Sequence, residues 1–431
     1  MTQAALAFET TWLESGIGND FDPTGRWPLR SADGAADGTE QQQGEIVTDK
    51  TVGSQRPALD KERSAAFMQN MTGIMNGGAL ALMCSIGHKT GLFDTMAAMS
   101  KPATPAEVAE AAGLQERYVR EWLAAMTAGG IVDHQVVEHQ AGGSNAYGGS
   151  GDTYYLPPEH AGLLTRAAGS LNMTTYCQYI SLLGQVEDDV VDAFKNGGGV
   201  PYDRYPQFQT LMAESSGQRL EKALISDVVP LLPGGHERLT AGVDLADVGC
   251  GSGRALNLLA ATYPNSRFTG FDIADAALDR ARADAAANGS ENIEFVTRDA
   301  AALNEPERFD LITSFDAVHD QAHPDKMLAG IYAALRPGGT YLCIEPKASS
   351  HLHENLDMPT APMMYTISTM HCMTVSLAYG GEGLGTAWGE QLAVEKLTAT
   401  GFVDIEVTGI KPDRANHYLL SSKALARETT V

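Results

Sequence analysis

The sequence feature that most constrains the fold is a glycine-rich turn between an apolar run and a helical run. The turn reads Asp-Val-Gly-Cys-Gly-Ser-Gly and contains Asp247, Gly249, Gly251 and Gly253. Residues 243–248 are too few and too apolar for a surface helix, whereas the residues after the turn continue at helical spacing. The turn therefore predicts a buried strand that ends at a sheet edge where ligands bind.

The glycines in this turn predict a cofactor cradle. Glycine admits backbone conformations closed to other residues and lets a ligand lie directly on the main chain. The first amides of the following helix can donate to polar groups of that ligand. The spacing is G-x-G-x-G led by an acid, which differs from the G-x-G-x-x-G of dinucleotide folds, and no lysine follows as in a P-loop.

An acid follows each of the next two predicted strands. Residues 267–271 end at Asp272, which we expect to accept hydrogen bonds from both hydroxyls of a ribose. Residues 293–296 precede Asp299, which is placed to accept from an adenine amino group. Because like charges repel, two carboxylates make phosphate a poor ligand here. Three neighbouring positions complete the predicted cofactor contacts, namely Ile273, Ala300 and Phe315.

From about Leu239 to the C-terminus, these residues resemble the class I S-adenosylmethionine-dependent methyltransferases. Further marks of that family follow in order: a strand at 309–312, a Leu-Arg-Pro-Gly-Gly turn at 335–339, a strand at 341–344, a helix at 390–400 and a closing antiparallel pair at 404–407 and 417–420. The resemblance implies an α/β fold with a Rossmann-like seven-stranded sheet, and S-adenosylmethionine as the cofactor.

The region before this domain has the pattern of a winged helix. Thr104 and Glu107 form a capping box for a helix that ends near Gly113, and a second helix is expected at 115–128. A strand-like run at 131–139, a glycine-rich tip at 142–151 and Tyr-Tyr-Leu at 154–156 complete the pattern. The second helix is expected to bury Tyr118, Val119, Trp122, Leu123 and Met126.

The same arrangement precedes the catalytic domain in plant-type small-molecule O-methyltransferases and in mycobacterial winged-helix methyltransferases. The chain resembles them over residues 60–431, which implies that the winged helix serves dimerisation and pocket closure. We expect an extended or partly disordered arm at 1–60, a winged-helix dimerisation domain at 61–160, a helical linker and pocket lid at 161–235 and the cofactor-binding domain at 236–431. The apolar stripe of residues 67, 71, 74 and 75 predicts a helix buried between the subunits of a homodimer.

Charge opposes a nucleic acid or an anionic membrane as partner. The chain has a formal net charge of −24 and a pI near 4.7. Residues 104–133, which contain the predicted recognition helix, carry five acidic side chains against two arginines. A DNA-binding helix needs basic side chains that offset phosphate charge. A transcriptional regulator that senses the cofactor without catalysis stays the alternative from another class.

Cysteine usage and hydropathy predict a soluble cytoplasmic protein. The five cysteines are odd in number and form no C-x-x-C pair, which favours a reducing compartment without disulfides or a zinc site. No leader-like start is present, and no apolar run approaches the roughly 20 residues that span a bilayer. His351 and His353 lack a third ligand at convincing spacing, so we expect no metal.

The predicted chemistry lies after the fourth strand, because the ends of strands one and four flank the cofactor in this fold. Plant-type O-methyltransferases place their base in a His-Asp-Trp sequence here, and His319-Asp320 matches its first two residues while Gln321 replaces the tryptophan. The resemblance implies His319 as the base that takes a proton from a hydroxyl or a thiol. His323, just before a predicted helix start at Pro324, is the other candidate.

The acceptor pocket is predicted from four side chains. Tyr202 lies on a loop, because three glycines and a proline at 197–201 oppose a helix. Met363 and His371 belong to a methionine-rich insertion after the fifth strand, and His323 is the fourth candidate contact. Methionine suits an apolar or sulfur-bearing acceptor. A small-molecule hydroxyl and a small thiol both remain open as the methyl acceptor.

Overall fold

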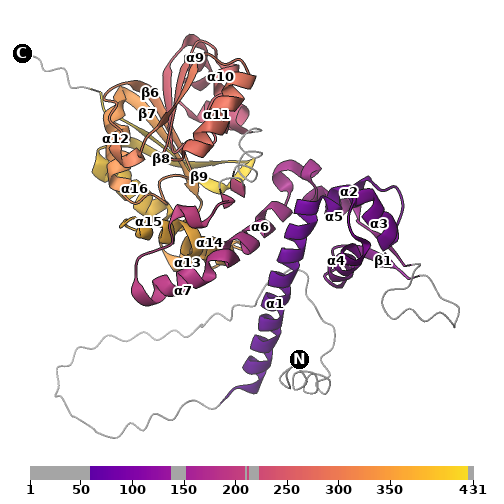
Figure 1. Cartoon of the computed structure of the whole chain (residues 1–431). Coiled ribbons are helices and arrows are strands. Elements are labelled where there is room, and N and C mark those ends of the chain that lie inside the picture. The colour runs from indigo at the N-terminus through magenta and orange to yellow at the C-terminus, as the bar shows by residue number, and fades with distance from the viewer. Residues whose placement is uncertain (1–58, 137–151, 209–210, 213–222, 426–431) are drawn as a thin grey trace, which may run out of the picture. The chain divides into compact units, whose positions relative to one another are not determined.

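A computed structural model describes residues 59–136, 152–208, 211–212 and 223–425. Met1–Lys61 and Glu62–Val431 form separate compact units, and all of the first unit except its last residues lies outside the description. The predicted arm at 1–60 and the predicted glycine-rich tip at 142–151 therefore fall almost wholly outside the described residues. The elements of the described chain are drawn in Figure 1.

The winged-helix prediction is confirmed. Helices α1 (Lys61–Thr90), α2 (Leu92–Ala98), α3 (Pro105–Ala112) and α4 (Glu116–Ala128) precede an antiparallel pair of β1 (Asp133–Gln135) and β2 (Thr153–Tyr155). The capping box forms as expected, since the Thr104 amide donates to Glu107 Oε2 at 2.8 Å and the Glu107 amide donates to Thr104 Oγ1 at 3.3 Å. Gly113 ends α3 with a φ of 67°, a conformation that favours glycine.

The predicted inner face of α4 is correct at four of its five positions. Val119, Trp122, Leu123 and Met126 are buried in a core shared with α2 and α3. Tyr118 was expected there but is 81% exposed. The four buried positions follow the i, i+3, i+4, i+7 spacing of one helical face, and position 118 lies beside that face rather than on it.

Helix α1 is largely open within one chain, so its predicted burial between subunits stays a prediction. Its apolar stripe lies open within this chain, with Phe67 63% exposed, Ile74 57% and Met75 60%. Only the C-terminal end is buried, around Cys84 and His88, and there Trp122 Nε1 donates to the Met83 carbonyl at 2.8 Å. The stripe is therefore not explained by packing among the described residues.

The linker is helical with the predicted break. Its elements are α5 (Pro158–Leu164), η1 (Arg166–Leu171), α6 (Thr174–Leu183), η2 (Gly184–Val186), α7 (Glu187–Asn196), η3 (Tyr202–Arg204), η4 (Leu224–Val228), η5 (Val229–Leu231) and α9 (Gly235–Ala241). Gly197 and Gly198 take φ values of 74° and 80° and end α7. Tyr202 therefore lies on a short turn after the break, as predicted.

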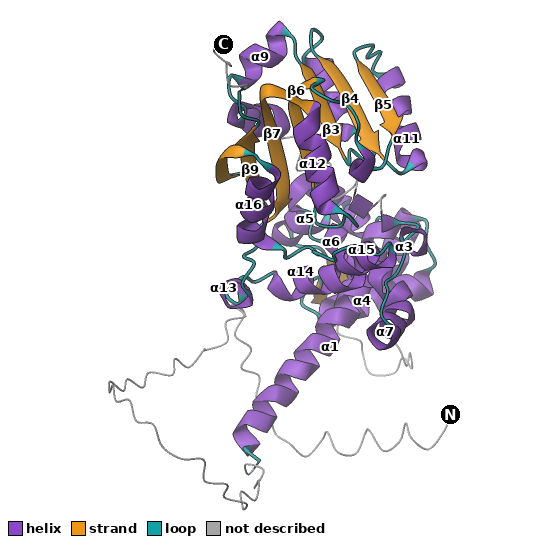
Figure 2. Ribbon diagram, turned by 90° about the vertical axis from the view of Figure 1, so that its left-hand side faces the viewer, coloured by secondary structure: helices purple, strands orange, loops and turns teal. Residues whose placement is uncertain are grey.

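The second half contains the expected seven-stranded mixed sheet (Figures 1 and 2). Its strands are β3 (Asp244–Val248), β4 (Arg267–Asp272), β5 (Ile293–Thr297), β6 (Phe309–Phe315), β7 (Leu335–Pro346), β8 (Val403–Ile410) and β9 (Asp413–Ser422). The order is β5-β4-β3-β6-β7-β9-β8, with β9 antiparallel to both β7 and β8 and the other pairs parallel. The chain leaves β3 toward β4 on one side and later returns to β6 on the other, so β3 ends at a topological switch point.

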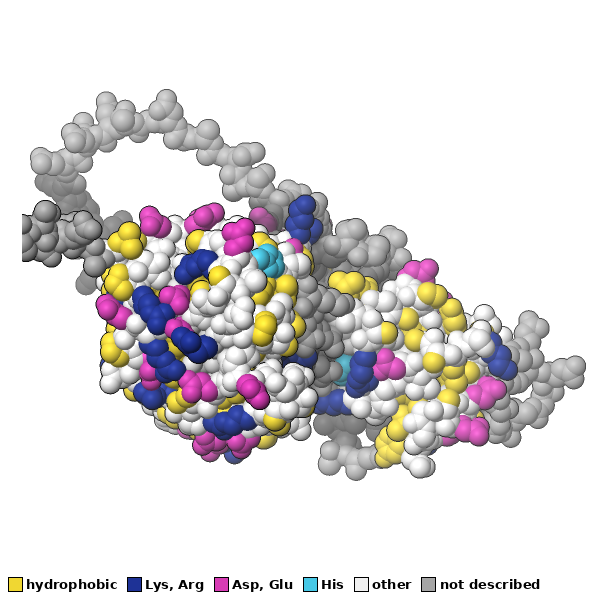
Figure 3. Space-filling model, turned by 90° about the horizontal axis from the view of Figure 1, so that it is seen from above, with side chains coloured by type: hydrophobic (Ala, Val, Ile, Leu, Met, Phe, Trp, Pro, Cys, Tyr) yellow, Lys and Arg dark blue, Asp and Glu magenta, His cyan; other side chains and the backbone are white. Residues whose placement is uncertain are grey.

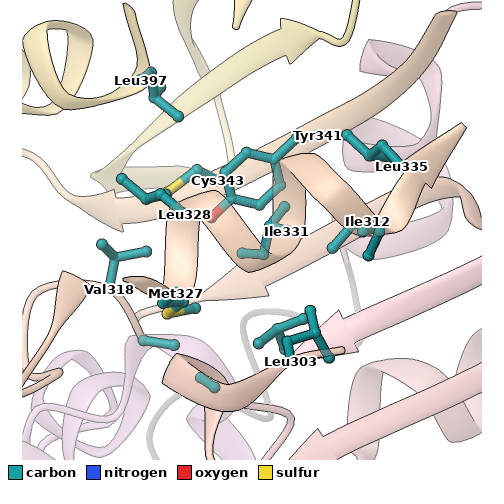
Figure 4. Close-up of a cluster of buried hydrophobic side chains, with 14 of the residues drawn as sticks. Leu303, Ile312, Val318, Met327, Leu328, Ile331, Leu335, Tyr341, Cys343 and Leu397 are labelled. Atoms are coloured by element: carbon teal, nitrogen blue, oxygen red, sulfur yellow. The ribbon is translucent and has the colours of Figure 1, made fainter. Parts of the chain in front are cut away.

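Strand residues alternate between two cores on opposite faces of the sheet. Leu245 and Leu311 pack with α10 (Arg254–Thr262) and α11 (Asp275–Ala287), whereas their neighbours Ala246 and Ile312 pack with α12 (Pro324–Ala334) and α16 (Gly389–Thr400). Figure 4 shows the second core, in which Tyr341 and Ile331 lie among the labelled side chains. Period-two burial on both faces is what a doubly covered parallel sheet requires.

The fifth strand begins earlier than predicted. The Leu-Arg-Pro-Gly-Gly stretch expected as a turn belongs to the start of β7, where the register shifts between Phe309 and Leu311 of β6. The remaining elements are η6 (Ala300–Ala302), α13 (Leu352–Asn355), α14 (Ala361–Ile367), η7 (Ser368–Cys372) and α15 (Met373–Ala378). These last four helical segments form the insertion between β7 and α16.

Side chains of both charges are exposed on the surface, as in the pair of Arg117 and Glu121. Figure 3 shows Lys and Arg side chains interspersed with Asp and Glu on the face drawn. Arg336 pairs with two acids of neighbouring strands, Asp244 at 2.8 Å and Asp310 at 2.7 Å. Within the described ranges, no helix combines the length and apolarity that a membrane span requires.

Candidate active site

A cavity of about 700 Å³ opens at the carboxyl ends of β3, β4, β5 and β6. It brings together eight of the nine predicted cofactor contacts. These are Asp247, Gly249, Gly251, Asp272, Ile273, Asp299, Ala300 and Phe315. Parallel strands end on one edge of a sheet, so residues distant in sequence meet there.

Gly253 is the ninth predicted contact and is not among the lining residues. It has a φ of +66°, and a Cβ at this position would lie 2.5 Å from Phe295 Cε1 and 2.8 Å from Ala281 Cβ. Its requirement for glycine thus comes from the packing of the turn against α11 and β5.

The glycine turn is held against the end of β4 by backbone hydrogen bonds. The amides of Gly249 and Cys250 both donate to the Phe271 carbonyl, at 2.8 and 3.1 Å. Gly249 has a φ of +80°, and a Cβ there would lie 2.6 Å from Ala317 Cβ in the loop after β6. The turn therefore joins three strand ends closely enough that a side chain does not fit between them.

Asp272 is held by two backbone amides. Its Oδ2 accepts from the Gly251 amide and its Oδ1 from the Ala274 amide, both at 2.8 Å. Burial raises the pKa of this carboxyl, while the amides of Ala274, Gly251 and Ile273 act in the opposite direction. Each carboxylate oxygen keeps a further lone pair, so both can accept from a diol held in the cavity.

Asp247 is more deeply buried, with 2% of its surface exposed. Thr313 Oγ1 on the neighbouring strand β6 donates to its Oδ1 at 2.9 Å. Burial, with a smaller contribution from the charge of Asp272, raises the pKa of Asp247 to about 7 although the Thr313 hydrogen bond lowers it. Asp299 differs, since it caps η6 by accepting from the Ala301 amide at 2.8 Å.

His319 lies in the loop between β6 and α12 and is 5% exposed. Its Nδ1 is 2.6 Å from Glu345 Oε2, at the end of β7, and it is not among the lining residues. Burial alone would lower the pKa of His319, but the charges of Glu345 and Cys372 hold it well above the usual value. The role of His319 as the base stays a prediction.

Glu345 is the residue that organises this loop. Its Oε1 accepts from the amides of Ala317 at 3.2 Å and Val318 at 2.8 Å, and its Oε2 accepts from Trp388 Nε1 at 3.2 Å besides His319. A carboxylate with four donors is a stable buried charge. One indication of this role was present in the sequence. Glu345 is an acid at the end of the fifth strand, β7, and β7 pairs with β6, the strand that precedes His319.

Asp320 and Tyr202 do line the cavity. The Tyr202 hydroxyl donates to Asp320 Oδ2 at 2.6 Å. Burial raises the pKa of Tyr202 well above its usual value, and the Asp320 carboxylate raises it further. His323 also lines the cavity, but it is exposed, and Pro324 begins α12 directly after it as predicted.

Met363 and His371 lie outside the group of lining residues. The His371 ring stacks on Phe208, with Tyr202 and Tyr205 edge-on, so it contacts two side chains that form the cavity wall. Burial, with the nearby charge of His319, lowers the pKa of His371 to about 3. Among the described residues neither ring nitrogen has a hydrogen-bond partner, so His371 is a neutral imidazole within an aromatic cluster.

Basic as well as acidic side chains line the cavity. Arg254, Arg280 and Arg298 line it together with the acids already named. Over the described ranges, no three His, Cys, Asp or Glu side chains are grouped to hold a metal ion. The arrangement suits an organic ligand with both positive and negative groups.

A parallel sheet with a glycine turn at its switch point, and acids after the next two strands, defines a Rossmann-like cofactor-binding domain. Two family models match the chain. Residues 78–166 match the Rv2258c-like winged HTH domain, and residues 239–392 match the Methyltransferase domain.

Two curated methyltransferases each match about a third of the chain or less. Ubiquinone/menaquinone biosynthesis C-methyltransferase UbiE of Methylobacterium nodulans is 33% identical over 144 residues, which are 33% of this chain and 54% of that protein. Phthiotriol/phenolphthiotriol dimycocerosates methyltransferase 1 of Mycobacterium ulcerans is 29% identical over 125 residues, 28% of this chain and 45% of that protein. The chain thus spans about half the length of the curated relatives it matches.

Solved structures share the fold over most of the chain. The mitomycin 7-O-methyltransferase MmcR superposes with a TM-score of 0.63 at 15% identity, over 85% of this chain and 100% of that one. Human N-acetylserotonin methyltransferase, in complex with SAM, superposes with a TM-score of 0.55 at 20% identity, over 85% of this chain and 99% of that one. The chain therefore combines an Rv2258c-like winged helix-turn-helix domain with a methyltransferase domain, which confirms the resemblance to S-adenosylmethionine-dependent methyltransferases.

Proposed function

We propose that this chain is an enzyme that transfers a methyl group from S-adenosylmethionine to a hydroxyl or thiol of a small molecule. The observation that carries the proposal is Asp272, whose two oxygens are held by amides at the mouth of the glycine turn, in one cavity with Asp247 and Asp299. Bound there, the cofactor supplies a methyl group activated by the positive charge of a sulfonium. The carboxylates favour such a cation and disfavour a phosphate.

Positioning is expected to account for most of the rate. Alignment of acceptor and donor can contribute about 7 to 11 kcal/mol, whereas a general base gives about 10² to 10⁴ in rate, or roughly 3 to 5 kcal/mol. The chain's own contribution is to close the cavity with Tyr202 and Phe208 from the linker and to hold the loop between β6 and α12 in place. This supports the linker, at about residues 161–235, as the part that covers the acceptor.

Donor affinity is expected to rise with pH up to about 7, the pKa of Asp247 in the empty protein. A cation bound nearby favours the ionised carboxylate, so below this pH binding releases a proton, and affinity gains up to about tenfold per pH unit. Calorimetric titrations with S-adenosylmethionine across this range measure the effect. The matched Asp247→Asn variant should give a flatter profile, and a wild-type affinity that is independent of pH contradicts the assignment.

The chain is proposed to form a homodimer through α1. The observation in support is the open apolar stripe of Phe67, Ile74 and Met75, because large apolar faces are costly to leave in water. Sedimentation should show a dimer for the wild type and a monomer for the double variant Phe67→Glu, Ile74→Glu. The control Gln69→Glu changes an exposed polar residue of the same helix and should stay dimeric. Sedimentation of the wild type as a monomer would contradict this proposal.

Nucleic acid is not proposed as a partner. The arginines of α4 are occupied within the helix, Arg117 with Glu121 at 2.6 Å and Arg120 with Glu116 at 2.5 Å. A cofactor-sensing regulator would need such side chains for phosphate. A reducing cytoplasm is proposed as the compartment, because the five cysteines of the sequence form no C-x-x-C pair.

The proposed activity is tested by a screen for release of S-adenosylhomocysteine. Purified chain is incubated with S-adenosylmethionine and a panel of small phenols, thiols and hydroxy acids. Turnover with a phenol or a thiol supports the proposal and selects between oxygen and sulfur. Donor binding with no turnover on any acceptor class, together with salt-dependent binding of DNA, favours the regulator instead.

A further inference from the structure

We infer that Asp320, hydrogen-bonded to Tyr202, accepts the proton of the methyl acceptor, and that His319 serves as a fixed cation behind it. The inference rests on the proposed methyl transfer and assigns the proton acceptor of that reaction. Two segments far apart in sequence form the pair, since Tyr202 follows the Gly197 break and Asp320 lies between β6 and α12. Neither the glycine turn nor the donor contacts contain this pair.

The geometry leaves one carboxylate oxygen of Asp320 available. Tyr202 donates to Oδ2 at 2.6 Å, and within the part of the chain that the structure describes no hydrogen bond reaches Oδ1. Both side chains line the cavity that the cofactor contacts share. His319 differs from Asp320 in that it is absent from the cavity wall, and its Nδ1 lies 2.6 Å from Glu345 Oε2.

The surroundings make Asp320 a stronger base than an ordinary aspartate. Burial raises its pKa, the His319 charge and the Tyr202 hydrogen bond lower it, and the charges of Glu345 and Asp272 raise it, with a net increase. A raised pKa makes the carboxylate a stronger base, while the hydrogen bond from Tyr202 stabilises its ionised form. His319 is therefore a positioning residue that acts through Asp320.

The step balances without a further reactant. A lone pair of the acceptor oxygen or sulfur forms a bond to the methyl carbon, and the methyl–sulfur bond breaks with its electron pair remaining on the donor sulfur. The acceptor proton passes to Asp320 Oδ1. The neutral carboxyl then loses its proton to solvent through the open cavity, which restores the starting state.

Four variants distinguish Asp320 from His319 as the proton acceptor. Asp320→Asn should lower kcat about 10² to 10⁴-fold with donor Kd within about threefold of wild type. Tyr202→Phe should move the acidic limb of the kcat/KM profile to higher pH, because the phenol stabilises the carboxylate. The neutral double variant His319→Gln, Glu345→Gln should move the same limb upward and keep activity at high pH. The control Asp325→Asn, at an exposed acid on α12 outside the cavity, should leave kcat within about twofold.

A second readout does not need an acceptor. Carboxyl carbon NMR of the apo protein, assigned by Asp320→Asn, should show Asp320 titrating above the usual value of about 3.9, and higher still in Tyr202→Phe. The inference is overturned if Asp320 titrates at or below that value, if Asp320→Asn keeps kcat within about fivefold, or if the His319, Glu345 variant is inactive at every pH. Wild-type chain that binds no donor overturns the proposed function itself, whereas donor binding with an active Asp320→Asn overturns only this inference.

Discussion

Replacing Asp272 by alanine is expected to weaken S-adenosylmethionine binding at least about 100-fold. A hydrogen bond to a charged group contributes about 1.5 to 3 kcal/mol, and the carboxylate is placed to accept two from a ribose diol. The substitution also releases the amides of Gly251 and Ala274, which no longer hold the turn. Calorimetric titration of the purified variant measures the loss.

Its matched control is Asp284→Ala, at an exposed acid of α11 that does not line the cavity. This variant should bind the donor as wild type does. Asp272→Asn is expected to fall between the two, because an amide oxygen accepts one hydrogen bond where the carboxylate accepted two. Equal affinity of Asp272→Ala and wild type contradicts the ribose assignment.

The second large effect is expected from Glu345→Ala, which should destabilise the folded chain by about 3 to 5 kcal/mol. Removing one partner of a buried ion pair leaves an uncompensated charge, here the His319 imidazolium, and strands the Ala317 and Val318 amides. Equilibrium unfolding in urea measures the change. Glu395→Ala, an exposed acid on α16, serves as the control and should change stability by less than about 0.5 kcal/mol.

The destabilisation should also depend on pH. The pKa of His319 is higher in the folded chain than in the unfolded one, so the pair stabilises fully below the free histidine value of about 6.5. Its contribution falls as the pH rises through the folded value. The gap between wild type and Glu345→Ala should therefore narrow in alkaline buffer, and a gap that widens there speaks against a protonated His319.

The sheet and the donor contacts were predictable because their signals are local. The glycines at the end of β3, followed by Asp272 at the end of β4 and Asp299 after β5, indicate which edge of the sheet binds the ligand. Parallel strands then bring these residues together without further information. The capping box at Thr104 is similarly local, and α3 begins where it predicted.

The acceptor end was less predictable because it depends on contacts between distant segments. The pairing of His319 with Glu345, and of Asp320 with Tyr202, is set by how the loop after β6 packs against β7 and the linker. The spacing of His319 and Asp320 along the loop does not tell which of the two faces the cavity. His371 and Met363 do not line the cavity. Their positions also depend on packing between distant segments, here against aromatic side chains of the linker.

The central claim is that the glycine turn and its carboxylates hold a sulfonium donor. Calorimetry of the purified chain with S-adenosylmethionine, S-adenosylhomocysteine and a pyridine dinucleotide tests it most directly. We predict saturable binding of the first two compounds at a single site, abolished in Asp272→Ala, and no heat from the dinucleotide. Binding of the dinucleotide without any response to the two adenosyl compounds would contradict the account.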